Sequence, residues 1–415
     1  MGYEQVRDAA QKAKVSAREI ATASTLVKNE ILKISAENLL TFESKLLEAN
    51  SRDVDEAKSS EISPTVVDRL RLDEKRISQM AEAVLSVADL QDPVGEIVEG
   101  HVRPNGLKVT KVRVPLGVIG IVYENRPNVT SDAAALTLKS GNAVILRGST
   151  SARNSNEVIA DAFRQALNKL GLNQNIVTLL KDSDHQSVVD LVSLKGIVDC
   201  VIPRGGKGLL ESVLSNAKVP VVVDGDGNCH VYVDKEADIT MAQKIVINAK
   251  MQRPSVCNAM ETLLIHRDVK ELFLRKVASE FESIEIYGDS ETQEIIKCAR
   301  EATEEDFATE FLDLKLAVKV VGSIEEAIEH VRKYSSGHSE AIVTNDYESA
   351  NKWVSEVDAA AVLVNCSTRF VDGGELGLGA EIGISTQKLH ARGPMGLRDL
   401  TSVKYVVYGD GQVRN

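Results

Sequence analysis

Cys257 is the residue of this 415-residue chain best suited to nucleophilic chemistry. It lies in the segment Gln-Arg-Pro-Ser-Val-Cys-Asn, just before an apolar run at 262–265. Backbone amides at such a junction between a loop and a strand can stabilise the thiolate, the reactive form of cysteine. A small buried residue is the structural alternative at this position. We expect Cys200 and Cys366 to pack inertly, and Cys298 to lie in a polar helix.

Two predicted strand ends carry residues suited to phosphate binding. Pro-Arg-Gly-Gly-Lys-Gly at 203–208 follows a buried strand and opens a helix, so its glycines would let backbone N–H groups and the helix N-terminus approach a phosphate. An ordinary turn could have the same residues. Leu-Arg-Gly-Ser-Thr at 146–150 adds a cation and hydroxyls at another strand end. Together they favour a dinucleotide site, and a 2′-phosphate would suit them, so NADP(H) is favoured over NAD.

Metal-site patterns are weak in this sequence. Asp-Gly-Asp-Gly-Asn at 224–228 resembles part of a calcium loop but lacks the closing glutamate, so it is interpreted as a turn. His330 and His338 lie eight residues apart without acidic or thiol neighbours. The five cysteines form no Cys-x-x-Cys pair, which favours a reduced compartment over disulfides or zinc. No metal is predicted.

The composition narrows the class of protein. Hydrophobic residues make up 43% and charged residues 27%, the balance of a soluble globular chain, and the length predicts two or three packed units. The net charge of −12 argues against nucleic acid or an anionic membrane as the main partner. The first residues resemble no secretion signal, and no apolar run is long enough to span a bilayer. A cytoplasmic location is expected.

The elements that position these residues fall into four regions. Helical spacing runs from 4 to 90, and a hairpin with its turn at 104–106 is predicted within 95–115, an edge that needs a partner. Two alternations of strands and helices follow, and 403–408 is extended. Alternation of this kind predicts parallel sheets covered on both faces, with ligands at the carboxyl ends of strands. The predicted strands are 118–122, 143–146, 176–180, 198–202 and 219–223, then 229–233, 261–265, 315–321, 339–344 and 359–364.

The chain resembles the aldehyde dehydrogenase superfamily, and most closely its gamma-glutamyl phosphate reductase branch. The resemblance runs from about residue 5 to residue 409. It is carried by Tyr-Glu-Asn-Arg-Pro at 123–127, Cys-Asn-Ala-Met-Glu-Thr at 257–262, Asn-Cys-Ser-Thr-Arg-Phe at 365–370, and the longer motifs at 327–342 and 377–385. Motifs this long and this widely spread are highly specific.

The resemblance implies an aldehyde-dehydrogenase-like α/β fold, with two doubly wound α/β domains and a β oligomerisation arm. The NADP-binding domain would comprise 1–96 and 114–228, the catalytic domain 229–390, and the arm 97–113 and 396–415. The arm implies a homodimer or homotetramer, because edge strands of this kind are commonly buried by a second subunit.

The resemblance also implies roles for catalytic residues. Cys257 matches the family nucleophile, and Asn125 matches the amide that forms the oxyanion hole with the Cys257 backbone N–H. Asp224 falls where the hydrolytic relatives carry a glutamate base. A shorter carboxylate there is consistent with hydride transfer to a thioester instead of hydrolysis. A simple cap on a strand end is an equal alternative for Asp224.

For the cofactor, Arg147 matches a cation against the adenosine ribose or its phosphate, and Thr150 leaves room for a 2′-phosphate where NAD-preferring relatives often carry a glutamate. Gly205 and Gly206 match the turn under the pyrophosphate. Glu310 matches a glutamate that holds the nicotinamide ribose, although the next three residues depart from the family's usual continuation. The remaining candidates are Ser149 for the cofactor, and Arg126, Ser367, Thr368 and Arg369 for the substrate.

The implied activity is NADPH-dependent reduction of L-glutamyl 5-phosphate to L-glutamate 5-semialdehyde and phosphate through a thioester on Cys257. This is the second step of proline biosynthesis from glutamate, and a glutamate kinase could hand over the labile substrate. Another aldehyde or acyl-CoA dehydrogenase of the same fold is the main alternative. A nucleotide-binding protein without catalysis, in which Cys257 only packs, is the alternative from another class.

Overall fold

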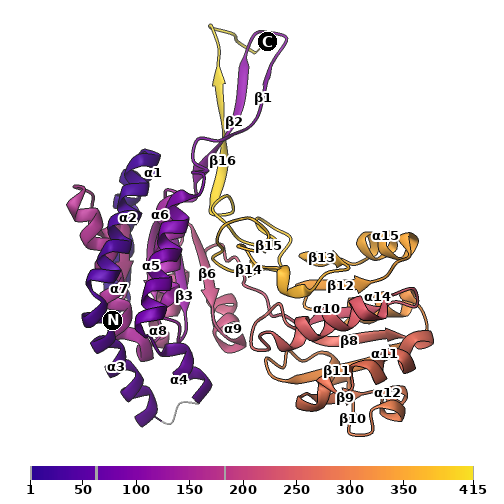
Figure 1. Ribbon diagram of the computed structural model, residues 1–415. Helices are drawn as coiled ribbons and strands as arrows, with labels where there is room; N and C mark the ends of the chain where they lie inside the picture. Colours follow the sequence, from indigo (N-terminus) through magenta and orange to yellow (C-terminus); the bar gives the residue numbers. More distant parts are fainter. Residues whose placement is uncertain (1, 61–63, 182–183, 415) are drawn as a thin grey trace. The chain divides into compact units, whose positions relative to one another are not determined.

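The computed structural model describes residues 2–60, 64–181 and 184–414 (Figure 1). The chain divides into two compact units. Unit 1 comprises Met1–Val223, Leu378–Gly383 and Met395–Asn415, and unit 2 comprises Asp224–Gly377 and Ile384–Pro394. The chain therefore passes between the units at several points along its sequence.

Helices occupy the first part of unit 1, which confirms the helical prediction for 4–90 apart from 61–63, which lie outside the described residues. Side chains cap two of the helix starts, with the Ser24 hydroxyl accepting from the Val27 amide and the Asp73 carboxylate accepting from the Arg76 amide. The helices are α1 (Tyr3–Ala21), α2 (Thr25–Thr41), α3 (Glu43–Ser59), α4 (Pro64–Leu70) and α5 (Glu74–Asp89).

A parallel sheet in the order β5–β4–β3–β6 forms the centre of unit 1. From β3 the chain continues to β4 and β5 on one side and then returns to place β6 on the other. Loops after β3 and β6 therefore diverge, and such a switch point is where open α/β sheets bind ligands. The strands are β3 (Val118–Tyr123), β4 (Ala143–Arg147), β5 (Val177–Leu179) and β6 (Cys200–Arg204); the helices are α6 (Asn128–Lys139), α7 (Arg153–Lys169), α8 (His185–Ser193) and α9 (Lys207–Asn216).

The prediction of a strand at 219–223 is wrong. Only a single bridge joins Val221 to Val201 of β6, with hydrogen bonds from the Val201 amide to the Pro220 carbonyl (2.9 Å) and from the Val222 amide to the Val201 carbonyl (3.0 Å). Pro220 has no N–H to donate, so a regular ladder cannot continue through it.

The predicted hairpin is confirmed as part of an antiparallel sheet in the order β1–β2–β16. It joins β1 (Ile97–Val102) and β2 (Lys108–Pro115) to β16 (Thr401–Tyr408), and the three strands are drawn together in Figure 1. The turn uses Gly106 at φ +86°, a conformation that glycine adopts without strain. Apolar side chains on both outer strands are exposed, including Val102, Tyr405 and Tyr408.

Unit 2 is built on a parallel sheet in the order β10–β9–β11–β8–β7–β12–β13. Alternate residues of its strands enter two separate clusters: Val231 and Leu263 pack on one face, and Tyr232 and Leu264 pack on the other against Trp353. Both faces are therefore covered, as predicted. The strands are β7 (Cys229–Val233), β8 (Met260–His266), β9 (Glu285–Gly288), β10 (Arg300–Glu301), β11 (Lys315–Val321), β12 (Ser339–Val343) and β13 (Ala361–Val364).

Helices and a small pair of strands complete unit 2. The sequence prediction missed β9 and β10, whose few residues carry too short an apolar pattern to be distinguished from a loop. The helices are α10 (Ile239–Met251), α11 (Lys270–Val277), α12 (Ser290–Ile295), α13 (Glu304–Phe307), α14 (Ile324–Tyr334) and α15 (Tyr347–Glu356), and the paired strands are β14 (Ile384–Ser385) and β15 (Gly393–Pro394). Within the described ranges, no helix combines the length and apolarity that a bilayer crossing needs.

Candidate active site

Asn125 lies in the turn after β3 of unit 1 with a left-handed backbone (φ 43°). Its side-chain Oδ1 accepts hydrogen bonds from the hydroxyls of Ser149 (3.3 Å) and Ser151 (2.6 Å), and its backbone N–H donates to Ser149 Oγ (3.2 Å). Since hydroxyl donors engage the amide oxygen, the Nδ2 group, which only donates, is directed away from them. The two serine hydroxyls thus fix the orientation of the Asn125 amide within unit 1.

The glycine turn after β6 already binds an anionic group. The Gly206 amide donates to Glu124 Oε2 at 3.0 Å, and a Cβ added at Gly205 would lie 2.5 Å from the same oxygen. Glu124 directly follows β3, so this contact spans the switch point of the sheet. Both glycines are exposed. Sequence reasoning assigned the turn to phosphate binding but did not single out Glu124.

The Arg147 side chain forms hydrogen bonds within unit 1. It is buried at the end of β4, where Nε donates to Ser187 Oγ (3.2 Å) and Nη2 donates to the Asp184 carbonyl (2.8 Å). These contacts hold the start of α8. Thr150 is exposed, in the 3₁₀ turn Thr150–Ala152.

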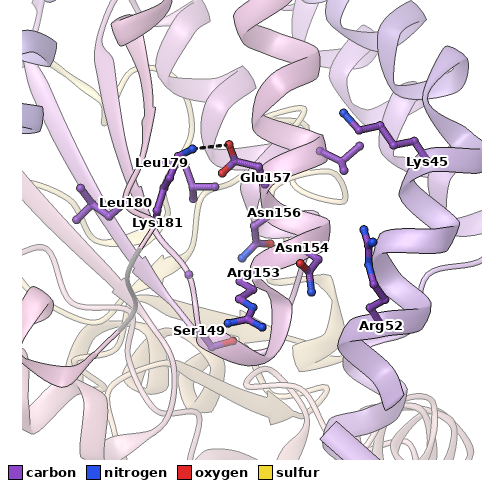
Figure 2. A pocket seen from close by; sticks show the side chains of 12 residues that line it. Lys45, Arg52, Ser149, Arg153, Asn154, Asn156, Glu157, Leu179, Leu180 and Lys181 are labelled. Carbon is purple, nitrogen blue, oxygen red and sulfur yellow. Dashed lines mark ion pairs between the residues drawn. The ribbon is translucent and has the colours of Figure 1, made fainter. Parts of the chain in front are cut away.

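A pocket of about 370 Å³ lies within unit 1, beside the ends of β4 and β5 (Figure 2). Lys45 and Arg52 come from α3, Arg153 comes from the first turn of α7, and Lys181 follows β5. Ser149 is the only predicted cofactor residue among those that line it. The other lining residues are Gly148, Asn154, Asn156, Glu157, Val158, Leu179 and Leu180. No sequence signal pointed to α3, because its residues precede β4 by about a hundred positions.

Cys257 of unit 2 is half-buried in the loop between α10 and β8. The loop is packed tightly against Gly227, where an added Cβ would lie 1.6 Å from the Cys257 carbonyl oxygen. The same oxygen accepts a contact from the Cys229 thiol at 3.1 Å. Because Cys257 precedes β8 and Gly227 precedes β7, both lie at the amino ends of strands. The position of Cys257 just before a strand agrees with the sequence prediction.

Glu310 closes the other side of the Gly227 turn. Its Oε1 accepts the Gly227 N–H at 2.7 Å, and burial raises the pKa of this carboxyl to about 7. A buried ion pair supports the same segment, since Lys250 Nζ lies 2.5 Å from Glu261 Oε2, and Glu261 Oε1 accepts the Leu312 amide at 3.1 Å. Glu310 therefore approaches the nucleophile loop through Gly227.

Asp224 and the 367–369 segment support the surrounding backbone. Asp224 Oδ1 accepts the Ile384 amide at 2.7 Å, where β14 begins. The buried Thr368 hydroxyl donates to the Asn258 carbonyl at 2.7 Å, next to Cys257. Ser367 Oγ accepts the Arg369 amide (3.3 Å).

Arg369 and Arg126 differ in their surroundings. Arg369 Nε donates to Gln252 Oε1 at 2.9 Å, and burial together with the nearby Arg253 cation lowers the pKa of Arg369. Arg369 thus brings a positive charge to the nucleophile loop. Arg126 of unit 1 is exposed, in the turn before α6.

Burial shifts the pKa values of several other cysteine and histidine side chains. Burial raises the pKa of Cys200 to about 12 and also raises the pKa of Cys366, which agrees with inert packing. Burial lowers the pKa of His338 to about 4. Across the described parts of the chain, no three His, Cys, Asp or Glu side chains are grouped as metal ligands would be.

Comparison with known proteins identifies the family of this chain. The aldehyde dehydrogenase family matches residues 1–305. The gamma-glutamyl phosphate reductase of Caldanaerobacter subterraneus subsp. tengcongensis is 53% identical over 407 residues, covering 98% of both chains, and that of Clostridium novyi is 52% identical over 411 residues, covering 99% of both. The crystal structure of the Thermotoga maritima gamma-glutamyl phosphate reductase superposes with a TM-score of 0.96 at 47% identity, over 99% of this chain and 100% of that one. The chain therefore belongs to the aldehyde dehydrogenase family, and within it to the group of the gamma-glutamyl phosphate reductases.

Proposed function

We propose that this oxidoreductase uses NADPH to reduce L-glutamyl 5-phosphate to L-glutamate 5-semialdehyde and phosphate, the second step of proline biosynthesis. The observation that carries the proposal is the fixed, half-buried Cys257 in a chain that shares more than half of its residues with the C. novyi and C. subterraneus reductases. Half-burial leaves a thiol accessible to a substrate while its loop stays ordered.

The reaction begins at the Cys257 thiolate. It attacks the acyl carbon, the carbon–oxygen bond to phosphate breaks, and a thioester forms. The Asn125 amide and the Cys257 backbone N–H stabilise the charge on the acyl oxygen, which is typically worth about 3 kcal/mol per donor. NADPH, when bound, supplies a hydride to the thioester carbon. The hemithioacetal then takes up a proton and releases the aldehyde as the carbon–sulfur bond breaks, restoring the Cys257 thiol.

The surroundings of Asp224 favour reduction over hydrolysis. A hydrolytic enzyme needs a carboxylate that activates water beside the thioester. Asp224 instead accepts the Ile384 amide, so its side chain is occupied in holding β14. This contact supports a capping role for Asp224 and leaves the thioester for hydride transfer.

The residues of unit 1 suit a dinucleotide phosphate. Enzymes of this family use NAD or NADP. The Gly206 amide donates to the Glu124 carboxylate, so a pyrophosphate that displaces this carboxylate could accept the same amide, and the pocket beside β4 offers cations to a further phosphate. We therefore assign NADP(H) binding to unit 1 and covalent catalysis to unit 2, with Glu310 holding the nicotinamide ribose.

Substrate recognition rests mainly on arginines. A positive charge is needed for the α-carboxylate of glutamyl phosphate, and Arg369 carries one beside the nucleophile loop. Arg126 is the second candidate. Ser367 and Thr368 act through the backbone contacts that hold this segment in place.

The sheet β1–β2–β16 is proposed to join subunits into a homodimer or homotetramer. Its support is the row of exposed apolar residues on β16, among them Val403, Tyr405 and Val407. Replacing Val407 by Asp should lower the mass measured by analytical ultracentrifugation. A cytoplasmic location and hand-over of the substrate by a glutamate kinase complete the proposal. The hand-over predicts that a larger fraction of the kinase's labile product is reduced than of free substrate supplied at the same rate.

The reverse reaction tests the function. Purified protein receives L-glutamate 5-semialdehyde, NADP and phosphate, and NADPH is followed by absorbance. Formation of NADPH should require phosphate and vanish in Cys257→Ala, while Cys298→Ala, which removes an exposed cysteine, should retain the activity. Turnover without phosphate would contradict the proposal and point to hydrolysis, and turnover that needs coenzyme A would favour an acyl-CoA dehydrogenase.

A further inference from the structure

The pocket beside β4 and β5 carries an excess of positive charge. Among the lining residues the cations are Lys45, Arg52, Arg153 and Lys181, and the acid is Glu157. This excess stands out in a chain whose net charge is −12. We propose that Arg52 and Arg153 bind the 2′-phosphate of NADP(H) and thereby decide the preference for NADP over NAD. This inference rests on the proposed function, which does not itself name Arg52 or Arg153.

The two arginines are accessible to a ligand. The side chains of Arg52 and Arg153 are 59% and 54% exposed. Arg52 lies 3.5 Å from Glu48, and Arg153 lies 3.1 Å from Glu56. Both glutamates lie on the exposed surface of α3. Exposed pairs of this kind are weak and exchange readily. A phosphate dianion can therefore replace these carboxylates, and the planar guanidinium fork matches two phosphate oxygens.

A buried junction holds both arginines in position. Asp53, which follows Arg52, is almost fully buried, and its carboxylate accepts the Asn154 amide (3.1 Å), the Ser155 amide (2.8 Å) and the Ser155 hydroxyl (2.6 Å). Asn154 in turn follows Arg153. The junction thus fastens α3 to the start of α7. It also occupies the Asn154 and Ser155 amides in the first turn of α7, so these two amides are not available to a phosphate.

The spacing of the sheet favours the 2′-phosphate over the pyrophosphate. The pocket adjoins the ends of β4 and β5, whereas the Gly206 turn follows β6 on the other side of β3. Two strand spacings separate β4 from β6, which is about 10 Å. A dinucleotide whose pyrophosphate binds at the Gly206 turn would extend its adenosine toward β4, where the cations of Figure 2 lie.

The other charged residues of the pocket are consistent with phosphate binding by Arg52 and Arg153. Glu157 is shared between Arg164 and Lys181, each at 3.5 Å, so its charge is partly neutralised within unit 1. Figure 2 marks the pair of Glu157 with Lys181 on the side of the pocket away from Arg52. Lys45 lies 3.9 Å from Asp161, a loose pair. The arginines are therefore the strongest candidates for phosphate binding.

Binding of cofactor fragments tests the inference without catalysis. Titration calorimetry compares 2′,5′-ADP, which carries the 2′-phosphate, with 5′-AMP, which lacks it. Arg52→Gln and Arg153→Gln should each weaken 2′,5′-ADP binding by roughly tenfold or more and leave 5′-AMP binding unchanged. The control is Lys58→Gln, which removes an exposed cation from α3 outside the pocket and should change neither ligand.

Three outcomes would overturn the assignment: no preference of the unmodified protein for 2′,5′-ADP, equal weakening of both fragments, or an effect of Lys58→Gln as large as that of Arg52→Gln. Arg52→Lys guards against misfolding, since it keeps the charge and should lose less affinity than Arg52→Gln. If the fragment preference is found but no glutamyl phosphate is reduced, the proposed function fails while the phosphate subsite stands.

Discussion

In unit 1, the candidate residues follow their strands, and their cations are exposed around an open pocket. In unit 2, the nucleophile precedes its strand, and its loop is fixed by backbone contacts with buried partners. A cofactor that must enter and leave in each cycle suits side chains that can exchange partners. A covalent intermediate suits a backbone that cannot move. The comparison teaches that the regions serving two steps of one reaction can differ greatly in how well they tolerate substitution.

The largest expected effect comes from Gly227→Ala. The new Cβ would lie 1.6 Å from the Cys257 carbonyl oxygen, so the nucleophile loop must shift. We expect a loss of about 3 kcal/mol or more in the free energy of unfolding, together with nearly complete loss of turnover. Chemical denaturation and the alkylation rate of Cys257 measure both.

Gly208→Ala is the matched control in unit 1, since a Cβ there meets nothing within 4 Å and alanine favours the helix α9. It should leave stability unchanged or slightly raised. Equal tolerance of the two substitutions would remove the contrast between the regions.

Asp53→Ala probes the buried junction between α3 and α7. It leaves the Asn154 and Ser155 amides without their acceptor, which should cost about 2 kcal/mol of stability. NADPH binding should weaken as well, because α3 would no longer be fastened to α7. Asp55→Ala, on the exposed surface of the same helix, serves as the control and should change neither quantity. Unaltered NADPH affinity in Asp53→Ala would show that the arginines need no such support.

Glu310→Gln sharpens the comparison through pH. The pKa of Glu310 is raised from 4.5 to about 7, so between these values the native state holds a proton that the unfolded chain has lost. Its contribution to stability is therefore full below pH 4.5 and is lost as pH rises through 7, by an amount on the order of 3 kcal/mol. The unmodified protein should lose more stability than Glu310→Gln between pH 5 and pH 8 in urea titrations. Parallel curves for both proteins would contradict this.

Ser151→Ala should have the smallest effect. It removes one of the hydroxyls that orient the Asn125 amide, so kcat should fall about fivefold while KM for NADPH stays unchanged, a change of about 1 kcal/mol. The effect should disappear in an Asn125→Ala background, because the two residues act through one contact. A persistent loss in that background would mean that Ser151 acts elsewhere.

Local patterns predicted strands of unit 1 and made Cys257 and the glycine turn after Arg204 candidates for the site. The resemblance to a family added Asn125, two positions after Tyr123, as a candidate. Arg52 was missed because only the Asp53 junction, a contact over a hundred residues, brings it to the pocket. The Gly227 contact was equally hidden, since a glycine turn alone does not show what presses against it.

The pairing of β2 with β16 also determines when this sheet can form during synthesis of the chain. The Thr110 hydroxyl donates to the Val406 carbonyl, 296 residues further along the chain. At roughly 5–20 residues per second of ribosomal synthesis, β2 waits on the order of 15–60 seconds for its neighbour. During that interval the edge of β2 is open to nascent chains nearby on the same messenger. Chaperone binding to the β1–β2 hairpin would therefore matter most in the middle of translation, long before the chain is released.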